Sequence, residues 1–204
     1  MAGLPRFIEA LARILRRVEA WEFCVPIKSP LEIPNLQFEL QKLAFIALGS
    51  NLGDPKQNVV QAMDRLQELS DFPLLRSSLW QSTPVDCPPG SPLFVNGVVG
   101  LLPGANETPE RLLDKLQSLE QEFGRRTKQV LNEPRPLDLD LISFRQEMRD
   151  SDRLTLPHPR AHLRRFVLQP LSEIAPGLML PGQVLDARQL IETLDRSEKI
   201  LRLS

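Results

Sequence analysis

A run in which leucine and aspartate alternate constrains the fold of this chain more than any other stretch. Residues 137–141 read Leu-Asp-Leu-Asp-Leu, and a β-strand turns successive side chains to opposite faces. The leucines are therefore predicted to enter a core, whereas Asp138 and Asp140 share the other face, roughly 6.5–7 Å apart along the strand. Two carboxylates at this spacing suit one or two Mg²⁺ ions, although the solvent face of a half-buried strand also commonly carries acids.

Cations gather just ahead of this strand. Residues 125–128 read Arg-Arg-Thr-Lys, and Arg135 comes shortly before the predicted strand. Such a cluster is ordinary at the solvated end of a helix. Its position before the acid pair, in a chain whose net charge is −1, also suits a polyphosphate that carries Mg²⁺. The residues alone leave both interpretations open.

The two histidines of the chain stand four residues apart, as zinc ligands on a helix do. Pro159 lies between His158 and His162, and no cysteine is near them in the sequence. A zinc site is therefore disfavoured, and we interpret His158 as a hydrogen-bond donor to a phosphate or a ribose.

The hydrophobic periodicity predicts strand, helix, strand, strand, helix and strand in this order. Helices are expected to begin at Pro55 and Pro109, each after a capping residue, Asp54 and Thr108. Strands are expected at 43–48, 74–82, 93–102 and 137–142. This β-α-β-β-α-β order predicts an α+β fold, an α/β sandwich with a ferredoxin-like core. Later segments add a short helix at 166–174, a last helix at 185–194 and an edge strand at 200–203, completing three αβα layers.

A proline-rich loop separates the second and third predicted strands. Residues 83–92 read Thr-Pro-Val-Asp-Cys-Pro-Pro-Gly-Ser-Pro, and a loop this long and stiff is more often functional than not. We expect it to form one wall of a site for a flat ligand. Asn96, in an otherwise apolar strand, either contacts that ligand or is satisfied by neighbouring backbone. Residues 49–53 lack the Lys and Ser/Thr of a phosphate-binding P-loop and are interpreted as a turn.

Composition excludes several classes of protein. A chain of 204 residues with 42% hydrophobic and 25% charged residues fits one globular domain, with or without a short appendage. The net charge gives no general attraction to nucleic acid, and no apolar run is long enough to cross a membrane. The two cysteines, Cys24 and Cys87, are far apart and fit a reduced thiol pair. We therefore expect a cytoplasmic monomer that binds neither nucleic acid nor membrane.

The first 42 residues are predicted to be an N-terminal extension. Residues 5–20 have the spacing of an amphipathic helix, and a proline-rich connector follows. Arginines in this helix are typical of an organelle transit peptide, whereas Glu9 and Glu19 favour a docking helix or a neutral extension. The main folded domain is expected to span residues 43–204.

Several ordered segments closely resemble the 6-hydroxymethyl-7,8-dihydropterin pyrophosphokinase (HPPK) family of folate biosynthesis over residues 43–182. They include Ala-Phe-Ile-Ala-Leu-Gly-Ser-Asn-Leu-Gly at 44–53, Ser-Thr-Pro-Val at 82–85, Phe-Val-Asn at 94–96, and Arg-Pro-Leu-Asp-Leu-Asp at 135–140. Glu120 with Gly124-Arg125, residues 153–160 and the stretch from Arg164 to Pro176 complete the resemblance. The fold expected from the family is the ferredoxin-like α/β sandwich.

The resemblance implies transfer of diphosphate from ATP, the co-substrate, to the hydroxymethyl group of the pterin, with AMP released. Asp138 and Asp140 would hold two Mg²⁺ ions, and Arg125 and Arg135 would join them as catalytic residues. The residues implied around ATP are Gln117, Glu120, Arg125, Arg135, Leu141, Arg153, Thr155, His158 and Arg164. Those implied around the pterin are Thr83, Pro84, Val85 and Asn96 at its edge, with Phe94 and Phe166 sandwiching its ring.

The chain departs from the family at the loop before Arg135. Asn132-Glu133 stands where the family usually has Trp-Gly, and Thr127 stands where a second arginine is common. The alternative function is a non-catalytic descendant that binds nucleotide or pterin and acts as an interaction protein. A Mg²⁺ phosphatase that uses Asp138 as nucleophile is disfavoured because Arg-Pro precedes the pair. An RNA-binding domain is disfavoured by the absence of tyrosine and the balanced charge.

Overall fold

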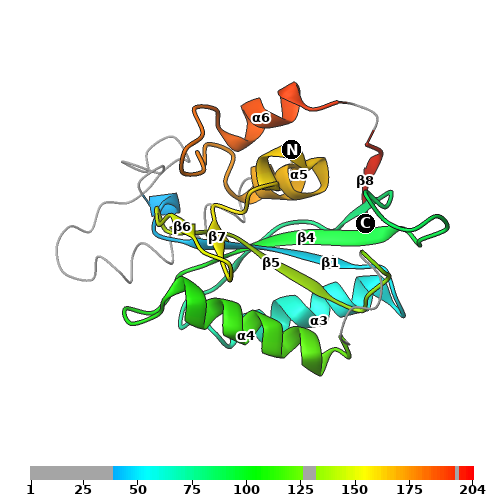
Figure 1. Ribbon diagram of the computed structural model, residues 1–204, viewed down its shortest axis with the longest axis horizontal. Helices are drawn as coiled ribbons and strands as arrows, with labels where there is room; N and C mark the ends of the chain where they lie inside the picture. Colours follow the sequence, from blue (N-terminus) through cyan, green and yellow to red (C-terminus); the bar gives the residue numbers. More distant parts are fainter. Residues whose placement is uncertain (1–38, 126–131, 196–197) are drawn as a thin grey trace.

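The computed structural model of the chain describes residues 39–125, 132–195 and 198–204. One sheet lies between two layers of helices, with α3 and α4 on one face and α5 and α6 on the other (Figure 1). The three-layer αβα arrangement predicted from the element order is therefore confirmed. The amphipathic helix predicted at residues 5–20 and most of the connector lie outside the described residues. Within those residues, no helix is both long and apolar enough to cross a membrane.

The sheet is antiparallel at every strand pair that the structure describes. Its strands follow the order β5-β1-β4-β3-β8, and β2 also pairs with β4. Their bounds are β1 Ala44–Ser50, β2 Leu75–Arg76, β3 Trp80–Ser82, β4 Phe94–Leu101, β5 Asp138–Phe144 and β8 Ile200–Arg202. Without β8, this is the order expected when a β-α-β-β-α-β chain folds into one sheet with both helices on one face. The ferredoxin-like core is confirmed, with β8 added at one edge.

The helices α3 (Pro55–Gln67) and α4 (Pro109–Glu122) begin where their sequences predict. The Asp54 carboxylate accepts a hydrogen bond from the Gln57 N–H at 3.0 Å, and the Thr108 hydroxyl accepts one from the Arg111 N–H at 3.3 Å. Each cap satisfies a donor that the first turn leaves unpaired. The apolar face of both helices packs against the sheet; its buried members are Val59, Ala62, Met63, Leu66, Leu112, Leu116 and Leu119.

The opposite face of the sheet is covered by α5 (Arg165–Ile174), and α6 (Ala187–Thr193) packs against α5. A second apolar cluster forms there, and Leu40 and Leu43 are buried in it although they lie at the start of the described chain. Packed structure therefore begins before residue 43. The predicted domain boundary itself, near residue 42, stays a prediction.

Two local predictions were wrong. The strand expected at 74–82 is divided into β2 and β3, because the Ser77 hydroxyl accepts the Val98 N–H at 2.9 Å and takes the place of a backbone partner. The list of expected strands also omitted β6 (Arg149–Asp150), which pairs with β7 (Thr155–Leu156) to form a small second sheet. A one-turn 3₁₀ helix, η2 (Ala161–Leu163), then leads into α5.

Candidate active site

Strand β5 places both aspartates on the α5 side of the sheet. Leu139 and Leu141 are buried in the cluster beneath α3 and α4, so Asp138 and Asp140 face the other way. Across the strand pair, Asp138 lies opposite Gly49 and Asp140 opposite Ala47. Because Gly49 and Ala47 have small side chains or none, they leave space above β1 beside the two aspartates.

A hollow, called here the first hollow, occupies this space. It is bounded by β1, β4, β5, the proline-rich loop and the beginning of α5. Its lining includes Thr83, Val85, Phe94, Asn96, Phe166, Arg135, Arg164, Asp138 and Asp140, together with Gly49, Cys87 and Asn132. At Gly49, a Cβ would lie 3.4 Å from Asn96 Oδ1 and 3.7 Å from Phe94 Cδ1. Because glycine has no Cβ, the floor of the first hollow stays open between the Asn96 amide and the Phe94 ring.

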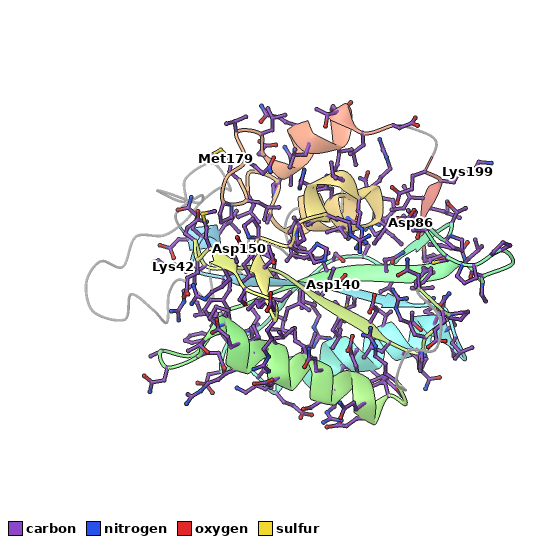
Figure 2. All side chains as sticks on the ribbon, viewed as in Figure 1. Lys42, Asp86, Asp140, Asp150, Met179 and Lys199 are labelled. Atoms are coloured by element: carbon purple, nitrogen blue, oxygen red, sulfur yellow. The ribbon has the colours of Figure 1, made fainter. Side chains whose placement is uncertain are left out.

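A second hollow lies on the other side of the acid pair. Its lining includes Leu141, Arg153, Thr155 and His158, with Leu113 and Leu139 among its apolar members. Asp140 lines both hollows, and it lies on β5 in the middle of the molecule (Figure 2). The chain thus places one carboxylate at the junction of two adjacent binding spaces.

Two arginines contact Asp138. Arg125 Nη1 lies 2.9 Å from Oδ1, and Arg135 Nη2 lies 2.5 Å from Oδ2. The side chains of Arg135 and Asp138 are each 18% exposed, so solvent screens this pairing only partly. Two of the cations that precede the acid pair in sequence, Arg125 and Arg135, therefore reach it in space.

Asp140 has a different set of charged neighbours. His158 Nε2 lies 3.9 Å and Arg164 Nη1 3.6 Å from its Oδ2. Burial, followed by the negative charge of Asp138, raises the pKa of Asp140 above its usual range. Burial lowers the pKa of His158 against the attraction of Asp140. Because His158 Nδ1 accepts the Arg160 N–H at 3.2 Å, the neutral ring carries its proton on Nε2, facing Asp140.

Glu120 lies on α4 behind the acid pair. It accepts the Leu139 N–H at 2.7 Å and also pairs with Arg125. Its side chain is 7% exposed, and burial raises its pKa to about 7. Glu120 therefore connects α4 to the backbone between the two aspartates.

Both arginines of the first hollow lie over aromatic rings. The guanidinium carbon of Arg135 is 5.5 Å from the centroid of Phe94, and that of Arg164 is 5.4 Å from the centroid of Phe166. A cation at this distance from a ring face is attracted by its quadrupole. Arg135 thus contacts both Phe94 and Asp138, and Arg164 contacts both Phe166 and Asp140.

The structure gathers most of the predicted site residues but not all of them. Gln117 is exposed on α4, and Gln117, Pro84, Glu120 and Arg125 are not among the residues that line either hollow. Glu120 and Arg125 nevertheless reach the site through Leu139 and Asp138. The functional roles assigned to all of these residues stay predictions.

Sequence reasoning missed Asn51, which it placed in an ordinary turn. Its side chain is buried, its Oδ1 accepts the Arg135 N–H at 2.8 Å, and its Nδ2 donates to the Pro92 carbonyl at 3.4 Å. Asn51 therefore joins the turn after β1 to Arg135 and to the proline-rich loop. The sequence did carry a signal for Asn51, because polar residues such as Ser50 and Asn51 at the end of a buried strand require hydrogen-bond partners.

Asn132, which stands where the family usually has tryptophan, forms a hydrogen bond between two loops. Asn132 Nδ2 donates to the carbonyl oxygen of Asp86 at 2.7 Å, and both residues have a φ of 55°. The side chain therefore connects the loop before Arg135 to the proline-rich loop. Asn132 lines the first hollow, and so do Val85 and Cys87 on either side of Asp86.

The acid pair fits a magnesium site. Mg²⁺ in phosphate-transfer sites uses one or two carboxylates and takes its remaining ligands from phosphates and water. No group of three or more His, Cys, Asp or Glu side chains able to hold a metal occurs among the described residues, so the pair would act with a phosphate ligand. Burial, and after it the negative charge of Asp138, raises the pKa of Asp140. A divalent cation held by the two carboxylates would relieve the repulsion between them.

Known proteins are similar to this chain in sequence and in fold. The family model of 7,8-dihydro-6-hydroxymethylpterin-pyrophosphokinase (HPPK) matches residues 45–176. A 2-amino-4-hydroxy-6-hydroxymethyldihydropteridine pyrophosphokinase of Pseudomonas aeruginosa is 41% identical over 151 residues, which cover 74% of this chain and 88% of that protein. The enzyme of the same name from Haemophilus influenzae is 40% identical over 140 residues, covering 68% and 85%.

Solved structures agree at the level of the fold. A Plasmodium falciparum HPPK-DHPS triple mutant, crystallised with pteroate, aligns with a TM-score of 0.57 at 13% identity. The alignment covers 74% of this chain but only 42% of that longer chain. The family match, the relatives that align over most of their length and the shared fold lead to one conclusion: this chain belongs to the 7,8-dihydro-6-hydroxymethylpterin-pyrophosphokinase family.

Proposed function

We propose that the chain transfers diphosphate from ATP to 6-hydroxymethyl-7,8-dihydropterin, a step of folate biosynthesis that releases AMP. The observation that carries this proposal is the position of Asp140, which lines both hollows. An acceptor in one hollow and a nucleotide in the other would meet at the carboxylate pair. Family membership supports the reaction class, and no observation favours a non-catalytic role.

The first hollow suits the pterin. A flat heterocycle stacks favourably against aromatic rings, and Phe94 and Phe166 both line this space. The Asn96 amide nitrogen donates to Ser82 Oγ at 2.9 Å and to the Trp80 carbonyl at 3.3 Å. Its oxygen is thereby directed toward the floor of the hollow, where it would accept hydrogen bonds from the pterin edge. Thr83, Pro84 and Val85 are proposed to complete that edge.

The second hollow suits ATP. Leu113 and Leu141 provide apolar surface for a base, whereas Thr155 and His158 provide polar groups for ribose or phosphate oxygens. The N–H that His158 presents on Nε2 is a donor in the neutral ring, so phosphate recognition there does not require a charged imidazole. Arg153 borders the same hollow and pairs with Asp114 on α4.

Asp138 and Asp140 are proposed to hold two Mg²⁺ ions together with the phosphates. Mg²⁺ bound there supplies neutralisation of phosphate charge and a lower pKa for the acceptor hydroxyl. Arg125 and Arg135 add planar guanidinium groups, which bind phosphate oxygens bidentately. Their present contacts with Asp138 place them within the same cluster.

The reaction then needs little covalent participation by the protein. The hydroxymethyl oxygen bonds to the β-phosphorus, and the bond from that phosphorus to the α-phosphate oxygen breaks. AMP leaves with the electron pair, and the hydroxyl proton is released to water. Catalysis by this chain consists of orienting the two substrates and neutralising charge that develops on the phosphates.

A coupled assay for AMP on the purified chain tests the proposal. AMP should form only when ATP, Mg²⁺ and 6-hydroxymethyl-7,8-dihydropterin are all present. Asp138→Ala and Asp140→Ala should each lower kcat by at least about a hundredfold, the scale on which a single electrostatic catalytic group acts. AMP release that does not depend on the pterin, or full activity in both variants, would refute the proposed function.

A further inference from the structure

Helix α5 begins without a cap from its own sequence. Its N-cap residue, Arg164, makes no side-chain capping hydrogen bond, and arginine has no acceptor to offer. The first N–H groups of a helix have no partner within the helix. Arg164 is instead directed toward Asp140, at 3.6 Å. The first turn of α5 therefore needs an acceptor from elsewhere in the chain.

Glu198 supplies that acceptor. Its Oε2 accepts the Arg165 N–H at 3.0 Å, and its Oε1 accepts the Phe166 N–H at 3.0 Å. A carboxylate at a helix N-terminus is also favoured by the helix dipole. Both oxygens of one side chain thus hold two successive peptide groups, and the second of these belongs to Phe166, which lines the first hollow.

The segment that carries Glu198 also contacts the opposite wall of the first hollow. The carbonyl oxygen of Lys199 accepts the Thr83 N–H at 3.4 Å. Strand β8 then pairs with β3, with Ser82 opposite Ile200. Residues 198–202 are therefore hydrogen-bonded to the beginning of the proline-rich loop and to the first turn of α5. This segment lies beyond residue 176, where the family match ends.

We propose that Glu198 is a positioning residue for the pterin, acting through the first turn of α5. Its two hydrogen bonds fix the peptide planes at the start of the helix, and these planes determine where the Phe166 ring lies. Since β8 is anchored to β3, the distance between the Phe166 wall and the Thr83 wall is set by the same short segment. The inference rests on the proposed function, in which Phe166 stacks on the pterin.

Variants at Glu198 and at a matched neighbour test this inference. Glu198→Ala removes both acceptors, whereas Glu198→Gln keeps one oxygen and removes the charge. Glu192 is an exposed acid on α6 that borders the same surface depression as Glu198, so Glu192→Gln is the control. The measurements are kcat and the KM values for pterin and ATP in the AMP assay, a fluorescence titration with the pterin, and the thermal unfolding midpoint.

Glu198→Ala should raise the KM and the dissociation constant for the pterin by about fivefold or more, the scale of a lost helix cap. The KM for ATP should change less, Glu198→Gln should fall between wild type and Glu198→Ala, and Glu192→Gln should match wild type. A lower unfolding midpoint with unchanged pterin KM, or an equal rise in both KM values, would overturn the positioning role. If Glu198→Ala does not fold, the comparison of Glu198→Gln with Glu192→Gln decides. Absence of AMP formation by the wild-type chain would instead refute the proposed function.

Discussion

Glu120 offers a direct test of how burial and ion pairing compete at this site. Arg125 and the Leu139 N–H stabilise the carboxylate and lower its pKa, whereas burial on α4 opposes ionisation and is the larger effect. The pKa is raised from 4.5 to about 7. Because the folded chain then binds more protons than the unfolded chain between these values, the contribution of this group to stability is greatest below pH 4.5. It is lost as the pH rises through 7.

The magnitude follows from linkage. A carboxyl group whose pKa moves from 4.5 to about 7 on folding lowers the unfolding free energy by about 3 kcal/mol as the pH rises across that window. Glu120→Gln removes the titration and keeps an oxygen that can accept the Leu139 N–H. The unfolding free energy of wild type minus that of the variant should therefore fall by about 2–3 kcal/mol between pH 5 and pH 8.

Urea unfolding followed by circular dichroism, in the presence of a chelator, measures this difference at each pH. Glu122→Gln is the control, because Glu122 lies on the same helix with its side chain 52% exposed. That variant should show nearly the pH dependence of wild type. If the difference in unfolding free energy between wild type and Glu120→Gln did not change with pH, the raised pKa of Glu120 would be refuted. If that difference increased with pH, the ion pair with Arg125 would be shown to outweigh burial.

Three further changes have defined outcomes. Asn51→Ala should lower the unfolding free energy by about 1–3 kcal/mol, because it leaves the Arg135 N–H without its buried acceptor; urea unfolding measures this, and an unchanged value would contradict it. Glu133→Gly, and Glu133→Gln as a test of charge alone, should lower the KM for ATP by removing a negative charge near the arginines that are proposed to bind phosphate. An unchanged or higher KM would reject that idea. Gly97→Ala should lower the unfolding free energy by less than about 1 kcal/mol, because its Cβ would lie 2.5 Å from the Met63 methyl group, the end of a flexible side chain that can shift; a larger loss in urea unfolding would show that Met63 cannot move aside.

The sequence by itself determined the features that depend on local geometry. A strand has a period of two, so the alternation at 137–141 was sufficient to place Asp138 and Asp140 on one face and their leucine neighbours in the core. Asp54 and Thr108 marked the starts of α3 and α4 because a capping oxygen acts on its own first turn. The order of these elements then predicted the ferredoxin-like sheet.

Tertiary structure alone decided which distant groups meet at the acid pair. Arg125 and Arg135 contact the same carboxylate because the end of α4 and the start of β5 converge there. Glu120 has a raised pKa because neighbouring elements exclude water from it. Glu198 reaches the first turn of α5 from the far end of the chain. No local pattern encodes the contacts of Arg125, Glu120 and Glu198, since each of them joins different elements of the fold. The pairing of Arg135 with Asp138, three residues apart, is the exception.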